Sequence, residues 1–139
     1  MSYAASAELQ QSIYQILTGY APLGAVIGDQ IFDADPQPDA GAGPDLYVLI
    51  GEEQAVDRSS KTHRGIEHRP VISVHSNEAG YARAKQTAAL ICEALEKTEP
   101  SVVSGTVVFC TFASARARRM RNSEQRRIEL RFRTLIDLN

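Results

Sequence analysis

The chain has 139 residues, of which 43% are hydrophobic and 23% charged, so it is long enough to bury one core and too short for two. We expect a single domain over residues 1–139. No segment approaches the roughly 20 apolar residues of a membrane span, and we expect no membrane partner. Residues 1–8 lack the basic start and apolar run of a secretory signal, so we expect the chain to stay in the cytoplasm where it is made.

The charges are separated along the chain, although the net charge is only −2. Residues 1–57 hold nine acidic and no basic residues, and residues 58–139 hold fifteen basic and eight acidic ones. This separation predicts opposed surfaces, each able to attract the unlike surface of another copy. The alternative is that both blocks are solvated and fold against each other within one copy.

Near the N-terminus, apolar residues recur with a helical period, at Leu9, Ile13, Ile16, Leu17 and Tyr20. Ser6 is the expected N-cap of this helix and Gly19 its end. A short apolar turn over residues 22–27 then leads to an extended piece that starts at Ile31 and Phe32.

Residues 33–45 contain three Pro, two Gly and four Asp, which predicts an exposed loop. The apolar run 46–50 predicts a buried strand. Residues 51–63 are polar and form either a second loop or a protruding hairpin. The period-two pattern of residues 66–75 predicts another strand, and Pro70 places that strand near an edge or turns the missing N–H toward solvent.

The longest helix is expected over about 78–97, capped by Ser76 or Asn77 and ended before Pro100. Residues 102–112 suggest a short hairpin, and residues 113–126 form a third polar stretch. In the last strand Ile128, Leu130 and Phe132 alternate with charged residues, mostly arginines. The order of elements predicts an α+β fold, in which an N-terminal helix and a long central helix pack on a mostly antiparallel sheet with long polar loops.

Nothing in the sequence predicts catalysis, a metal or another cofactor. His63 and His75 lie at odd offsets from His68, so in a regular strand neither could share a metal ion with His68. Glu67 also points to the opposite face from His68 and cannot orient it as a general base. Cys92 and Cys110 lie among apolar neighbours, where a thiolate is disfavoured, and we expect free thiols. The Gly-containing stretch 41–44 lacks the other residues of a phosphate-binding loop.

Six arginines fall within residues 116–127. One interpretation is a small regulatory or nucleic-acid-binding protein that uses this segment. No aromatic residue for base stacking lies between Phe112 and Phe132, and the pI of about 5.9 also argues against it. Two other interpretations remain: the arginines pair with carboxylates of a neighbouring subunit, or they form a solvated loop without a role.

The order of several short motifs resembles the tail-completion, or tail terminator, proteins of long-tailed phages and gene transfer agents, including the terminator of lambda-like phages. The motifs are Gly-Asp-x-Ile-Phe-Asp at 28–33, Tyr-Val-x-Ile-Gly at 47–51, Glu-His-Arg-Pro-Val-Ile-Ser-Val-His-Ser at 67–76, Gly-Tyr-Ala-Arg-Ala-Lys at 80–85 and Arg-Arg-Ile-Glu-Leu-Arg-Phe-Arg at 126–133. The Pro-rich loop 33–45 and the arginines of 116–127 depart from the family pattern.

The resemblance implies a non-enzymatic virion protein, assembled in the host cytoplasm. It implies a hexameric ring that caps the tail tube, binds the tube protein and the head-proximal connector or stopper, and lets DNA pass through its lumen without sequence recognition. We expect acidic residues of the loop 33–45 to meet arginines of an adjacent copy, or one of the charged loops to dock the tube. The candidate interface residues are Asp33, Asp35, Asp39, Arg58, Lys61, Arg116, Arg118, Arg119 and Arg121.

Overall fold

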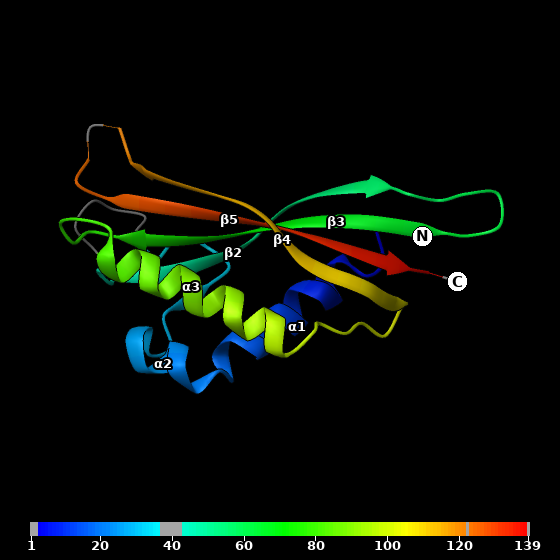
Figure 1. The fold of residues 1–139 in the computed structure, drawn as a ribbon, viewed down its shortest axis with the longest axis horizontal. Coiled ribbons are helices and arrows are strands. Elements are labelled where there is room, and N and C mark those ends of the chain that lie inside the picture. Colours follow the sequence, from blue (N-terminus) through cyan, green and yellow to red (C-terminus); the bar gives the residue numbers. More distant parts are fainter. Residues whose placement is uncertain (1–2, 37–42, 122, 139) are drawn as a thin grey trace.

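The computed structural model describes residues 3–36, 43–121 and 123–138, and it confirms the predicted α+β fold. Three helices lie on one face of a twisted sheet (Figure 1). In chain order the elements are α1 (Ser6–Thr18), α2 (Ala21–Ile27), β1 (Ile31–Phe32), β2 (Leu46–Asp57), β3 (Gly65–Ser76), α3 (Ala82–Lys97), β4 (Thr106–Arg119) and β5 (Arg126–Asp137).

The sheet order is β1-β2-β3-β5-β4, with β1 parallel to β2 and the other neighbours antiparallel. The last strand in the chain, β5, therefore lies between β3 and β4. The described part of the chain contains no helix with the length and apolar character to cross a bilayer.

The core lies between the helices and one face of the sheet. The predicted stripe of α1 is buried at Leu9, Ile13 and Leu17, and it packs in one cluster with residues such as Ile72 and Ile91. Burying each such side chain contributes about 1.5–3 kcal/mol relative to its exposure in water. The apolar face of β5 is buried as predicted.

Gly19 ends α1 as predicted, but both predicted N-caps were wrong. The N-cap of α1 is Ala5, because the Ser6 hydroxyl donates instead to the Glu53 carboxylate of β2. α3 begins at Ala82 rather than near 78. Ser76 Oγ accepts a hydrogen bond from the Glu78 N–H within the turn, and Gly80 has a positive φ of 80°, which the helix cannot continue through. The apolar turn over 22–27 is a short helix, α2.

Two stretches predicted from their polar residues belong largely to strands. Residues 51–57 complete β2, which confirms the hairpin interpretation, since β2 and β3 join through the loop 58–64 and protrude at one end of the molecule (Figure 1). Residues 113–119 complete β4, and the predicted short hairpin over 102–112 was wrong because β4 runs unbroken from Thr106. The outer half of β2 extends past the helices and that of β4 lies at the sheet edge, so most residues of both halves face solvent and lose the alternating pattern.

β3 is a central strand, so the expectation of an edge position for Pro70 was wrong. Pro70 pairs with Glu53 on β2. On the other side, pairing with β5 runs from Gly65 to His68, skips two residues and resumes in the same register at Val71. The missing N–H of Pro70 falls in that interruption, which is how a central strand accommodates proline here.

Candidate assembly interface

The candidate residues lie at three separate places on the sheet. Arg116, Arg118 and Arg119 project from β4, and Arg121 follows in the turn toward β5. All four are exposed. Arg118 contacts Glu129 at 3.6 Å, whereas the other three make no ion pair or side-chain hydrogen bond within the described residues.

The acidic candidates lie at the opposite edge. Asp33 and Asp35 directly follow the edge strand β1, and both are exposed. Gln10 Nε2 donates to Asp33 Oδ2 at 3.5 Å, and the Tyr47 hydroxyl donates to Asp35 Oδ1 at 3.4 Å. Asp39 lies outside the described residues.

Three strands therefore separate these acidic and basic candidates within one copy. At a strand spacing of ~4.8 Å the edges are roughly 19 Å apart, well beyond the reach of an ion pair. Elsewhere an acidic residue of 1–57 does meet an arginine of 58–139, since Arg127 Nη2 lies 3.3 Å from Glu52 Oε1. Asp33 and Asp35 thus cannot neutralise the arginines of β4 without a second copy.

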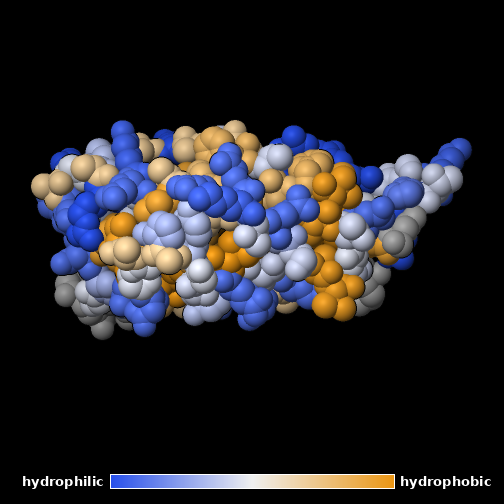
Figure 2. Space-filling view, turned by 60° about the horizontal axis from the view of Figure 1, so that its bottom comes forward, coloured by the Kyte–Doolittle hydropathy of each residue, from blue (hydrophilic) through white to orange (hydrophobic). Residues whose placement is uncertain are grey.

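Arg58 and Lys61 occupy the third place. They lie at the tip of the β2–β3 hairpin, at the far end of the long axis from the β4–β5 turn (Figure 1). Figure 2, which views the molecule from the side of the helices, shows this tip as a narrow projection. Lys61 is exposed, and Arg58 Nε lies 3.6 Å from Glu67 Oε1. The structure does not bring these two residues together with residues 116–121.

The sheet face turned away from the helices carries a buried carboxylate surrounded by guanidinium groups. Arg133 donates to Glu67 Oε1 at 2.9 Å, and Arg69 donates to Oε2 at 2.6 Å. Because these hydrogen bonds favour the ionised form, they lower the pKa of Glu67 from 4.5 to about 2. Glu67 therefore holds the arginines flat against the sheet.

Glu129 repeats this arrangement on β5. Arg131 donates to its Oε2 at 3.0 Å, and Arg127 Nε lies 3.2 Å from its Oε1. Glu129 is buried although it faces away from the core. The cationic face predicted for β5 is thus partly neutralised by carboxylates from within the sheet, which leaves the arginines of β4 as the more available positive charge.

A polar cluster ties the N-terminus to the β2–β3 hairpin. Ser6 Oγ donates to both oxygens of Glu53, at 3.0 and 2.9 Å, and His68 Nδ1 lies 2.9 Å from Glu53 Oε1. Burial raises the pKa of Glu53, but the hydrogen bonds from His68 and Ser6 outweigh it, and the pKa is lowered. Sequence reasoning missed this cluster because its three residues are distant in the chain.

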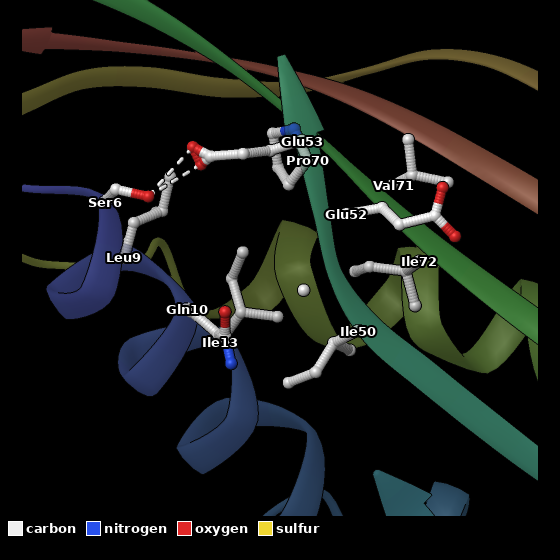
Figure 3. A pocket seen from close by; sticks show the side chains of 11 residues that line it. Ser6, Leu9, Gln10, Ile13, Ile50, Glu52, Glu53, Pro70, Val71 and Ile72 are labelled. Carbon is white, nitrogen blue, oxygen red and sulfur yellow. Dashed lines mark hydrogen bonds between the residues drawn. The ribbon is translucent and has the colours of Figure 1, made fainter. Parts of the chain in front are cut away.

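This cluster is not a catalytic triad, because the carboxylate rather than the imidazole contacts the serine. The adjacent cavity, shown in Figure 3, holds about 20 Å³, room for a water molecule rather than a substrate. Its inner wall consists of apolar side chains such as Leu9, Ile13 and Ile50. The site therefore anchors α1 to the sheet.

The remaining histidines and the cysteines are dispersed. His75 stacks on Tyr47, at 4.8 Å between ring centroids, on the face opposite His68, as the strand period predicted. His63 lies in a loop and contacts Asp137. The described residues hold no group of three or more His, Cys, Asp or Glu that could bind a metal. Cys92 and Cys110 are free thiols whose pKa is raised by burial.

Comparison with known proteins connects this arrangement to a family. The family described as "Tail completion protein gp17" matches residues 11–137. A chain in the virion of a native gene transfer agent particle is similar in structure, with a TM-score of 0.87 and 38% sequence identity. The match covers 98% of this chain and 99% of that chain. A search of curated proteins finds no match.

Proposed function

Because the chain belongs to the "Tail completion protein gp17" family, we propose that it forms a ring that ends the tail tube of a long-tailed phage or gene transfer agent. The family and the virion chain confirm the resemblance seen in the sequence. The protein is a structural component of such a particle and not an enzyme. The ring would join the tube to the head-proximal connector.

One observation carries this proposal: the similarity to the virion chain spans nearly all of both chains. The two chains thus share the whole fold, including the sheet edges that hold the charged candidates. A cyclic ring uses two different surfaces of each subunit, one meeting the other on the next copy. Acidic and basic edges on opposite sides of one sheet suit such head-to-tail contacts.

In the ring, Asp33, Asp35 and Asp39 of one copy would face the arginines of 116–121 on the next. An exposed ion pair contributes only ~0–1 kcal/mol, so these charges would select the register and apolar contacts would supply most of the association energy. Arg58 and Lys61, at the hairpin tip, would dock the tail tube protein. A hexamer with an acidic lumen would let DNA pass without sequence recognition or tight binding.

Removing the gene tests the proposal. Without a terminator, we expect electron micrographs to show filled heads separate from tails, and tubes of variable length because nothing stops their growth. A copy of the gene supplied elsewhere should restore joined particles. Normal joined particles without this protein would contradict the proposal. If the purified protein also bound short DNA duplexes with a steep salt dependence, a nucleic-acid-binding role would replace it.

A further inference from the structure

The sheet leaves a long strand edge uncovered at β4. This strand is last in the sheet and pairs with β5 on one side, and no described segment pairs with its other side. Residues 111–119 are all exposed, including Phe112, whose side chain is 52% exposed. A strand edge with free N–H and C=O groups is a template for a further strand.

The opposite edge is open along part of β2. β1 covers β2 only at Val48 and Leu49, so the outer side of residues 50–57 has no strand partner within the part of the chain that the structure describes. Most of these residues are exposed as well. This stretch of eight residues is close in length to the nine exposed residues of β4.

The two edges carry opposite charges. Residues 111–119 hold three arginines and no acidic residue, and residues 50–57 hold Glu52, Glu53 and Asp57 and no basic residue. We propose that residues 111–119 of one copy add as an antiparallel strand to residues 50–57 of a second copy. This inference rests on the proposed ring and specifies how its subunits join.

Strand direction allows this addition to repeat. The strands β2, β3, β5 and β4 alternate in direction, so β4 runs opposite to β2. A second copy in the same orientation therefore presents its β2 antiparallel to β4, and no copy has to be inverted. Such a contact is heterologous and can close into a ring.

The antiparallel direction also brings the predicted charges together. It places the arginine end of β4 over the Ile50 end of β2, beside the acidic residues that follow β1. The carbonyl oxygen of Asp33 is 3.7 Å from where a Cβ on Gly51 would lie. A parallel addition would instead move the arginines to the Asp57 end, away from Asp33 and Asp35.

The lengths of the two edges set the register. Pairing the eight residues 111–118 with 50–57 puts Arg116 opposite Glu52 of the second copy on the same sheet face, and it leaves Arg119 beyond the pair, beside the end of β2 that β1 covers. In its own sheet Arg116 is level with Leu49, through Glu129 and Ser73. Each copy is thus offset by three residues, roughly 10 Å at ~3.3 Å per residue. A constant offset tilts the strands, as closing a sheet into a ring requires.

Cysteine cross-linking in assembled particles tests the strand pairing. In a chain with Cys92→Ala and Cys110→Ala, Ser114→Cys is combined with Gln54→Cys, the position that the register places opposite it on the same sheet face. Glu52→Cys and Val56→Cys replace Gln54→Cys in two further chains to cover a shift of two residues. The control combines Ser114→Cys with Ala55→Cys, which points to the other face.

Purified particles are oxidised mildly and separated on a non-reducing gel. We expect at least one same-face pair to give a ladder of covalent oligomers beyond the dimer, with at least tenfold more cross-linked chain than the control. Monomers from all three same-face pairs, in particles whose heads and tails are joined, would overturn the strand pairing and leave the ring intact. Joined particles that lack this chain would overturn both.

Discussion

Replacing Glu67 with Gln measures how much the arginines on the open sheet face depend on one buried carboxylate. The Glu67 side chain is 2% exposed and touches Arg69, Arg133 and, less closely, Arg58. Gln keeps the size of the side chain but removes its charge. We expect Glu67→Gln to lower the free energy of unfolding at neutral pH, because three guanidinium groups then lose their anionic partner.

The lowered pKa of Glu67 gives the size of the expected loss in the free energy of unfolding. A drop from 4.5 to about 2 corresponds to about 3.4 kcal/mol at ~1.36 kcal/mol per pKa unit. The arginine side chains are 35–50% exposed, and solvent screening reduces this to about 1–2 kcal/mol. Because the folded-state pKa lies below the unfolded one, the stabilisation is fully present above pH ~5 and is lost as the pH falls toward 2.

Urea unfolding of the wild type and Glu67→Gln at pH 7 and pH 3 measures this difference. Glu78→Gln is the matched control, since Glu78 binds Arg83 at 3.0 Å and the two side chains are 35% and 52% exposed, and it should cost less than about 0.5 kcal/mol. At pH 3 the effect of Glu67→Gln should fall below half its value at pH 7. Equal effects of the two variants, or an effect of Glu67→Gln that is the same at both pH values, would refute the reasoning.

Two further variant pairs test packing and assembly. Gly105→Ala should destabilise the protein by about 1–3 kcal/mol, since its Cβ would lie 2.5 Å from the Asp137 carbonyl oxygen. Gly24→Ala in α2 is its control: the added Cβ meets nothing within 4 Å and should stabilise the protein by up to about 1 kcal/mol. A thermal unfolding temperature of Gly105→Ala at or above that of Gly24→Ala would contradict this packing. The double variant Arg116→Glu with Arg119→Glu breaks no internal ion pair and should reduce incorporation of the protein into particles at least tenfold on immunoblots. The control, Lys85→Glu with Lys97→Glu on α3, should not reduce it. Equal incorporation of the two double variants would show that β4 is not at the interface.

The sequence predicted those elements whose burial is one-sided. In α1 and β5 a single face meets the core, so apolar residues recur with the period of the element and both were found. The outer halves of β2 and β4 have solvent on both faces, and their polar residues therefore look like loops. The start of α3 was misplaced because capping residues also stabilise the turn before it, as Ser76 does with Glu78.

The charges of the candidate residues could be predicted from the sequence, but their positions in the sheet could not. Counting acidic and basic residues predicted two opposed surfaces, and the structure has Asp33 and Asp35 at one sheet edge and the arginines of β4 at the other. That β4 is an edge strand, and that Arg118 already contacts Glu129, depends on the pairing of strands distant in sequence. For the same reason the cluster of Ser6, Glu53 and His68 had no local signal.

Strand order converts the charge separation of the chain into a separation between sheet edges. If β4 paired with β3 and β5 formed the edge, the free edge would carry Glu129 among its arginines and would attract an acidic partner less. Because β5 enters between β3 and β4, Glu129 is buried beside the arginines of its own strand. Arg116 and Arg119 of β4 are thereby left exposed, at the sheet edge opposite Asp33 and Asp35, and under the proposed ring they would face a second copy.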